Sequence, residues 1–452
     1  MIKKAGRIGL APLVSPGQTA NERGRRIADD SRKYMLKREG IEVFCPDDPI
    51  ITIEDAARAV SLFRRSEIDA LVILHCMHSP GNLTAELVRD LPVPLAIWGV
   101  PEVPFDANPL NCASMMSLIG HAAALTATGR RFTFVYGLPD AEEARRDLDK
   151  FLKAIMVRGA LRRAAIAFIG YKSSAAYAAV IDEVLIKHLF GTEVRHVPIS
   201  DIIAEVRQLQ PEEIDADLRE VQSGDYLVEV TDHEALRRSC AAYVALRKIV
   251  ERGGFAAIAN KCWPELTDTE KLGICAVHSR LTDAGIPSSC DGDVDGALTM
   301  LVQHLYTGRP PFYANWLQRD EKNNAVQFWA CGSAPASLVS PRFEPKITDS
   351  QRGEENVIFD FPLKTGDVTL ARLQSFRGGY KLLLIRGRAV ETPPVLKGTY
   401  LTVRFEPPVR ALLDTILKHG FPQHVSIVYE DIEGELIEFA EQLGLEVVTP
   451  PK

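Results

Sequence analysis

Strand-like and helix-like segments alternate several times between Arg7 and about Arg162, and this alternation constrains the fold more than any other feature. Each strand-like run is mostly apolar and is followed by a segment of helical periodicity, such as the one from Glu54 to Glu67. Such alternation is typical of a parallel sheet covered on both faces. We predict a doubly wound α/β domain over residues 1–162, with strands in IGLAPLV, IEVFC, ALVILHC, PLAIWGV and FTFVYGL.

A second α/β unit begins at the apolar run AAIAFIGY and is predicted to span residues 163–311. A turn, Gly170-Tyr171-Lys172-Ser173-Ser174, follows its first strand and precedes a predicted helix through about Leu189. The turn faintly resembles a phosphate loop, but the spacing of the preceding glycines is wrong. An ordinary strand-to-helix turn is the preferred interpretation.

The alternation of predicted strands and helices ends after Pro311. The runs VQFWACG, VIFDFP, VTLARLQ, YKLLLIRGRAV and YLTVRFE are separated by Gly and Pro turns, with no helix between them. This pattern indicates an antiparallel, barrel-like sheet. We predict a β-rich C-terminal domain over residues 312–452 that closes with a helix ending before Gly420, a strand beginning at His424 and a last helix. Three domains suit a chain of 452 residues.

Composition excludes several classes of protein. The net charge is −7 and no basic stretch stands out, which argues against nucleic acid as a partner. About 18 consecutive apolar residues would be needed to span a membrane, and no such run occurs. The eight cysteines are scattered without a CxxC pair, and the N-terminus lacks the features of a signal peptide. We therefore expect free thiols and a cytoplasmic location.

Two predicted strands end in acidic segments. The run FAAIAN ends at Asn260 and is followed by Lys261, Trp263 and Glu265, whereas IPSSC leads directly to Asp291 and Asp293. Ligands of open α/β sheets collect at the carboxyl ends of the strands, so the carboxylates could face one crevice. Lys261 is a candidate cationic partner for the acids, and Trp263 is either a core anchor or a wall of the site.

The segment Asp291-Gly-Asp293-Val-Asp295-Gly296 matches the first half of a calcium EF-hand loop. That loop requires Glu at its twelfth position, which here is Val302 within an apolar helical run, so the EF-hand interpretation fails. An ordinary alternative is that Asp291 or Asp293 caps the following helix. A second alternative to the EF-hand is a site in which carboxylates from the two strand ends hold a divalent cation. Oxygen ligands favour Mg²⁺ or Mn²⁺, and an added imidazole favours Mn²⁺ or Co²⁺.

Three motifs in the chain are similar to those of the L-fucose isomerase and L-arabinose isomerase superfamily, particularly its shorter fucose isomerase-like members. They are Cys262-Trp263-Pro264-Glu265, Cys290-Asp291-Gly292-Asp293 with the following Gly296-Ala297-Leu298-Thr299-Met300, and Gly420-Phe421-Pro422-Gln423-His424. The resemblance implies two α/β domains and a β-rich C-terminal domain. It also implies a homo-oligomer, a trimer or a hexamer.

The resemblance further implies a cytoplasmic aldose–ketose isomerase that acts on an open-chain sugar. Its metal would be Mn²⁺, with Co²⁺ or Mg²⁺ as alternatives, held by Glu265, Asp291 and His424. Glu265 and Asp291 would also move a proton between neighbouring carbons through an enediolate, because the metal stabilises the developing negative charge. Lys261, Trp263 and Asp293 would contact the substrate.

The chain departs from the superfamily pattern at two places. The second acidic position often holds Glu, and the shorter Asp291 could transfer the ligand role to Asp293. Ala330-Cys331-Gly332 stands where a histidine is expected before Cys-Gly, so the sugar is not specified. Two alternatives remain open at this point: a non-catalytic sugar-binding protein, and a metal-dependent lyase or epimerase acting on a modified sugar.

Overall fold

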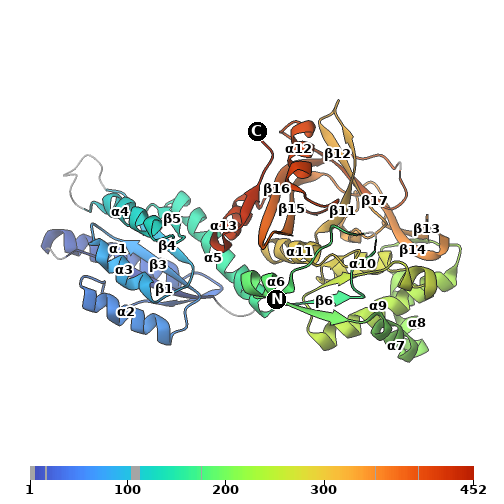
Figure 1. Cartoon of the computed structure of the whole chain (residues 1–452), viewed down its shortest axis with the longest axis horizontal. Coiled ribbons are helices and arrows are strands. Elements are labelled where there is room, and N and C mark those ends of the chain that lie inside the picture. The colour runs from blue at the N-terminus through green and yellow to red at the C-terminus, as the bar shows by residue number, and fades with distance from the viewer. Residues whose placement is uncertain are drawn as a thin grey trace. The chain divides into compact units, whose positions relative to one another are not determined.

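The first five strands form one parallel sheet in the order β2-β1-β3-β4-β5 (Figure 1). The computed structural model describes residues 6–15, 18–102, 112–174, 176–351, 353–394 and 396–451. Helices α1 and α5 supply the apolar core on one face of the sheet, and α2, α3 and α4 supply the core on the other. The predicted doubly wound arrangement is therefore confirmed. Its elements are β1 (Gly6–Leu13), α1 (Gln18–Leu36), β2 (Ile41–Phe44), α2 (Ile53–Arg65), β3 (Ala70–His75), α3 (Gly81–Arg89), β4 (Leu95–Gly99), α4 (Ser114–Ala127), β5 (Thr133–Tyr136) and α5 (Glu142–Arg163).

A second parallel sheet has the strand order β10-β9-β6-β7. Strands β6, β9 and β10 are buried, whereas the edge strand β7 is largely exposed. The core on one face comes mainly from α9 and α10. The elements of this region are β6 (Ala165–Ile169), α6 (Glu183–Phe190), β7 (Glu193–Val197), α7 (Ile199–Gln208), α8 (Pro211–Ser223), α9 (His233–Gly253), β9 (Ala257–Asn260), the π-helical turn η1 (Glu265–Thr269), α10 (Cys275–Asp283), β10 (Ser288–Ser289) and α11 (Val294–Thr307).

Helix α6 begins later than expected. The sequence predicted a helix directly after Ser174, but α6 begins at Glu183, where the side chain of Asp182 caps it by accepting a hydrogen bond from the Leu185 N–H at 2.9 Å. Residues 171–174 and 176–182 form turns and loop instead. Polar turn residues and a late capping residue therefore outweigh the helical composition of this stretch.

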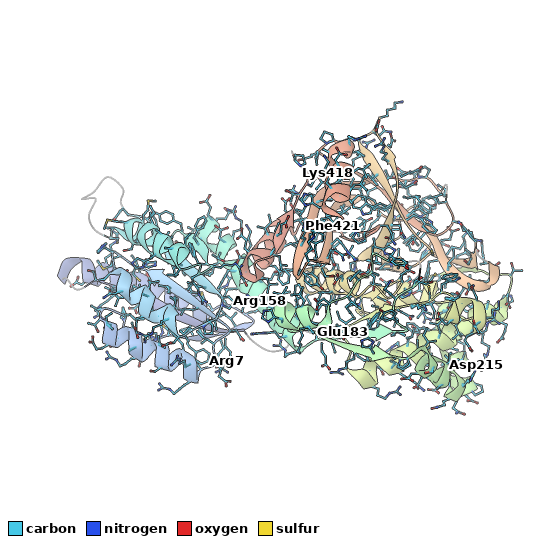
Figure 2. The ribbon with its side chains drawn as sticks, viewed as in Figure 1. Arg7, Arg158, Glu183, Asp215, Lys418 and Phe421 are labelled. Carbon is cyan, nitrogen blue, oxygen red and sulfur yellow. The ribbon has the colours of Figure 1, made fainter. Side chains whose placement is uncertain are left out.

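Six antiparallel strands of the C-terminal region close into a barrel. The pairings run β16-β15-β18-β11-β12-β17, and β17 pairs again with β16. The barrel-like prediction is confirmed. A large apolar core joins side chains of the barrel strands to those of neighbouring helices, and it includes Phe421, which Figure 2 labels. The barrel strands are β11 (Phe312–Asp320), β12 (Ala325–Ala330), β15 (Gly366–Phe376), β16 (Gly379–Val390), β17 (Thr399–Arg404) and β18 (His424–Val428).

Four further strands extend the barrel sheet at its edges. One of them, β8 (Leu227–Glu229), comes from the region of the second parallel sheet and pairs in parallel with β13. The remaining elements are the 3₁₀ turn η2 (Ala336–Leu338), β13 (Lys346–Ser350), β14 (Gly353–Pro362), α12 (Val409–His419), α13 (Glu433–Leu443) and β19 (Glu446–Val448). Helix α11 packs against β9 of the parallel sheet and against β15 and β18 of the barrel.

The chain forms two compact units. The first contains residues 1–160 together with 434–444, and the second contains residues 161–433 and 445–452. The predicted boundary at residue 311 falls within the second unit, and the division into three domains stays a prediction. No helix among the described residues is long and apolar enough to cross a membrane.

Candidate functional site

Strands β9 and β10 are parallel neighbours, with Ser288 opposite Ile258 and Ser289 opposite Ala259. Both strands end at the same edge of the sheet, so the segments that carry Glu265 and Asp291 leave from one edge. The two predicted strand ends are confirmed. Since ligands bind beyond the carboxyl ends of parallel strands, this edge is the candidate active site.

Glu265 begins the π-helical turn that follows β9. Its Oε1 accepts a hydrogen bond from Lys261 Nζ at 2.7 Å, so the predicted pairing of Lys261 with an acid is confirmed. The other oxygen, Oε2, is buried and has no hydrogen-bond partner among the described residues. Burial tends to raise the pKa of Glu265, but the hydrogen bond and charge of Lys261 outweigh it and hold that pKa below its usual value. Trp263 is exposed, which excludes the core-anchor alternative.

Asp291 and Gly292 form a tight bend between β10 and α11. Both residues have left-handed backbone conformations, with φ of 59° and 67°. The backbone carbonyl of Asp291 accepts a hydrogen bond from the Ser173 N–H at 3.1 Å, and the Asp291 side chain remains partly exposed. The bend therefore leaves the carboxylate of Asp291 accessible at the sheet edge.

Asp293 is the N-cap of α11, which confirms the capping alternative for this residue. Its Oδ1 accepts from the Gly296 N–H at 2.9 Å and from Arg372 at 2.9 Å, and its Oδ2 accepts from the Tyr313 hydroxyl at 2.6 Å. A second Arg372 nitrogen lies 2.8 Å from Oδ2, and the side chains of Arg372 and Asp293 are only 0% and 2% exposed. Burial pushes the pKa of Asp293 upward, but the charge of Arg372 holds it far below its usual range. A substrate contact by Asp293 stays a prediction.

His424 is the first residue of β18, as predicted, and lies opposite Asn315 of β11. Its Nε2 lies 3.7 Å from Asp291 Oδ2, and its Nδ1 lies 3.7 Å from Asp293 Oδ2. The Tyr313 ring packs beside the imidazole with its centroid 4.9 Å away. Thus the barrel brings a histidine to the acidic segment at the edge of the parallel sheet. Within the described ranges, however, no three His, Cys, Asp or Glu side chains are grouped so that they could hold a metal ion.

Sequence reasoning missed two groups that support the site. Arg372, in the buried strand β15, holds Asp293. Arg372 is the charged residue within the apolar run VTLARLQ, and this was a signal in the sequence that a buried acid must lie opposite it. Asp295 is also buried and accepts hydrogen bonds from the Tyr380 hydroxyl at 2.5 Å and the Ser375 N–H at 3.0 Å. Burial raises the pKa of Asp295 to about 6. Both groups fix α11 against the barrel.

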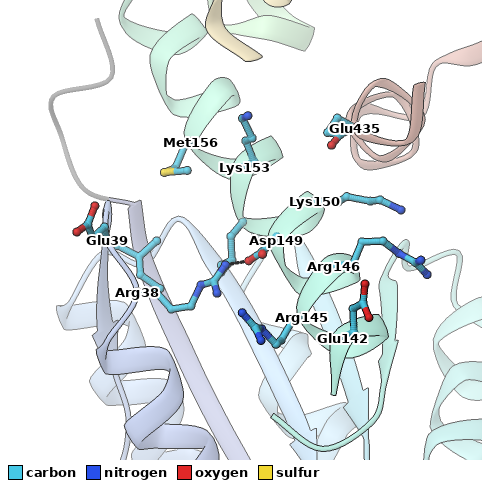
Figure 3. Close-up of a pocket in the computed structure, with 12 residues that line it drawn as sticks. Arg38, Glu39, Glu142, Arg145, Arg146, Asp149, Lys150, Lys153, Met156 and Glu435 are labelled. Atoms are coloured by element: carbon cyan, nitrogen blue, oxygen red, sulfur yellow. Dashed lines mark ion pairs between the residues drawn. The ribbon is translucent and has the colours of Figure 1, made fainter. Parts of the chain in front are cut away.

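A hollow lies within the first unit (Figure 3). Its volume is about 780 Å³, and the side chains that line it are mainly charged, with basic and acidic groups intermixed. Arg38 is ion-paired there with Asp149. The mixed charge favours no particular ligand, and none of the predicted site residues lines this hollow.

Two segments of the chain match known domain families. Residues 177–308 match the L-arabinose isomerase central domain, and residues 359–449 match the L-fucose isomerase C-terminal domain. These segments contain Glu265, Asp291 and His424.

Three relatives named sulfoquinovose isomerase align with almost the whole chain. The protein from Alkalicoccus urumqiensis is 26% identical over 409 residues, which are 89% of each chain. The protein from Priestia aryabhattai is 23% identical over 94% of this chain and 96% of its own. The protein from Clostridium sp. (strain MSTE9) is 25% identical over 91% of this chain and 92% of its own.

A solved structure of a Burkholderia multivorans ABC transporter solute binding protein covers 68% of this chain and 95% of its own, at 13% identity. Its TM-score is 0.18, so it gives no support to the sugar-receptor alternative.

The matching domains and the named relatives define the class of protein as aldose–ketose isomerase, an intramolecular oxidoreductase. The matches at residues 177–308 and 359–449, together with the relatives, confirm the resemblance to the superfamily of L-fucose isomerase and L-arabinose isomerase found in the sequence motifs.

Proposed function

We propose that the chain is a metal-dependent aldose–ketose isomerase in which Glu265, Asp291 and His424 would close around the metal on binding, since the described residues hold no such group ready-formed. The proposal rests on one observation. His424 Nε2 lies 3.7 Å from Asp291 Oδ2, although the two residues are far apart in the sequence. The buried Oε2 of Glu265 supports the proposal, since this carboxylate oxygen has no compensating donor or cation among the residues that the structure describes. Two carboxylates and one imidazole suit Mn²⁺, with Co²⁺ or Mg²⁺ as alternatives.

The contacts of the two aspartates favour Asp291 over Asp293 as the ligand. Both oxygens of Asp293 already accept hydrogen bonds, from Arg372, Tyr313 and the Gly296 N–H. Asp293 instead faces Nδ1 of His424, the position from which a carboxylate orients a metal-binding imidazole. We assign Asp293 as a positioning residue and Asp291 as the ligand.

In the proposed reaction, a carboxylate removes a proton from carbon 2 of the open-chain aldose, which gives an enediolate. The proton returns to carbon 1, and the hydroxyl proton moves from the oxygen on carbon 2 to the oxygen on carbon 1, which completes the ketose. Glu265 and Asp291 are the candidate bases, and the Lys261 ammonium favours the ionised form of Glu265 that accepts a proton. A bound divalent ion would supply positive charge that stabilises the negative oxygen of the enediolate.

The relatives suggest the substrate. Their shared name supports sulfoquinovose, a hexose that carries a sulfonate on carbon 6, as the sugar that this chain isomerises. We further propose a homo-oligomer, a trimer or hexamer, that acts in the cytoplasm without nucleic acid or membrane partners.

The test is to compare Glu265→Gln with Glu270→Gln, a matched change at the other end of the same turn. Isomerase activity on sulfoquinovose is assayed with Mn²⁺, and bound metal is measured in parallel by mass spectrometry. We expect Glu265→Gln to lose activity by about a hundredfold or more and to bind less metal, while Glu270→Gln keeps both. Full activity of Glu265→Gln on the true substrate would end the assignment.

A further inference from the structure

The turn from Gly170 to Ser174 follows β6 and lies directly against the bend at Asp291. The Ser173 N–H donates to the Asp291 carbonyl at 3.1 Å. A Cβ added at Gly292 would lie 2.3 Å from the Tyr171 carbonyl oxygen and 2.9 Å from the Lys172 Cα. The backbone of Lys172 therefore contacts Gly292, the residue that follows the proposed metal ligand Asp291.

The backbone of this turn has an unusual conformation. Gly170 and Tyr171 have φ of 73° and 67°. For a bulky aromatic residue such as Tyr171 the left-handed region is costly, and residues in this region cluster at functional sites. Tyr171 is also exposed, so burial of its ring does not offset that cost. The turn holds Lys172 at the sheet edge despite this cost.

The charge of Lys172 has no counter-charge among the described residues. Its Nζ lies 3.5 Å from the Ala176 carbonyl oxygen and 4.9 Å from the centroid of the Tyr177 ring. The other cations close to the site are already neutralised, Lys261 by Glu265 and Arg372 by Asp293. A half-buried ammonium without a carboxylate partner favours an anion in its surroundings.

We propose that Lys172 is the subsite for the anionic group at the far end of the sugar, an inference that rests on the proposed function. An open chain of six carbons spans about 6 Å, with bonds of about 1.5 Å. A lysine side chain has a similar reach, and the backbone of its turn contacts the bend at Asp291 and Gly292. The proposal therefore places the group on carbon 6 at Nζ and carbons 1 and 2 at Asp291 and His424. One ammonium matches the single charge of a sulfonate better than the charge of about −1.5 to −2 on a phosphate. Lys172 thus selects a sulfonated hexose.

The experiment compares Lys172→Ala, Lys172→Arg and the control Lys322→Ala, which changes an exposed lysine in the turn between β11 and β12. Each Mn²⁺-loaded enzyme is assayed on sulfoquinovose, on 6-deoxy-D-glucose, which lacks the sulfonate, and on D-glucose 6-phosphate. We expect Lys172→Ala to raise KM for sulfoquinovose by about tenfold to a hundredfold and to leave kcat/KM for 6-deoxy-D-glucose unchanged. Lys172→Arg should keep most of the preference for sulfoquinovose over 6-deoxy-D-glucose, and Lys322→Ala should match the unmodified enzyme on every sugar.

Four results would contradict the inference in whole or in part, each in a distinguishable way. Equal losses on the charged and uncharged sugars would show a structural role for Lys172, and no loss on either would show that the anion binds elsewhere. A Lys172-dependent preference for D-glucose 6-phosphate over sulfoquinovose would keep an anion subsite but replace sulfonate by phosphate. If the unmodified enzyme isomerises none of the three sugars, the proposed isomerase function is refuted for these sugars, and the proposed anion subsite is refuted with it.

Discussion

Gly292 is the residue at which the contact between the two sheet-edge loops can be tested most sharply. Its φ is 67°, and a Cβ there would lie 2.3 Å from the Tyr171 carbonyl oxygen. Gly308, at the other end of α11, has the same φ of 67°, but a Cβ there would meet nothing within 4 Å. Gly308→Ala therefore measures the backbone cost alone, which is about 1 kcal/mol for an alanine in the left-handed region. Gly292→Ala adds a steric clash with backbone, which costs about 1–3 kcal/mol more.

We expect Gly292→Ala to lower the free energy of unfolding by about 3 kcal/mol and Gly308→Ala by about 1 kcal/mol, both measured by urea denaturation. The Tyr171 carbonyl must also move by roughly 0.7 Å to restore a separation of about 3 Å. That movement disturbs Asp291, and a misplacement of about 1 Å at a reacting group can cost about a hundredfold in rate. Equal stability and activity for the two variants would refute the contact between Gly292 and the Tyr171–Lys172 backbone.

The remaining predictions concern Asp293, Asp295 and the proposed metal site. Asp293→Asn keeps the helix-capping oxygen but leaves the buried Arg372 charge uncompensated, so urea denaturation should show a loss of about 3–5 kcal/mol, and a loss below about 1 kcal/mol would contradict the ion pair. The folded-state pKa of Asp295 is raised to about 6, so protonation favours the folded state, and its contribution to stability grows as pH falls from about 6 to 4. Asp295→Asn should remove that gain, about 2 kcal/mol in the difference between pH 6.5 and pH 4.5, whereas an identical pH response in both proteins would argue against the shift. Chelation should abolish activity and Mn²⁺ should restore it. His424→Asn should lose about a hundredfold in activity along with its metal, while the control His419→Asn, at a half-buried position in the last turn of α12, keeps both. Retention of metal by His424→Asn would count against the ligand role.

Much of the fold could be predicted because apolar strands and amphipathic helices alternate regularly up to Arg162. The antiparallel strands after Pro311 were equally visible, since Gly and Pro turns separate them. A barrel-like sheet was expected, but the strand order and the pair that closes it, β16 with β17, were not predictable, because they depend on sheet twist and on the pairing of all six strands. The short edge strands β8 and β19 have three residues each, too few to give a periodic pattern.

The site was predictable to the extent that it follows from strand ends. Glu265 and Asp291 were found because parallel strands deliver their following residues to one edge, and His424 was found through a motif resemblance. Asp293 could not be assigned from sequence, because an acidic residue before a helix is equally suited to capping and to ligand binding. Its partner Arg372 is separated from it by 79 residues, so only the folded barrel shows that both oxygens of Asp293 are occupied.

A crystal structure of the Mn²⁺-loaded enzyme, with anomalous scattering recorded at the manganese edge, tests the central claim most directly. We predict one strong anomalous peak with an oxygen of Glu265, an oxygen of Asp291 and Nε2 of His424 at about 2 Å to 2.3 Å. A peak that lacks any one of these three ligands, or that lies on Asp293 instead, would contradict the proposed site.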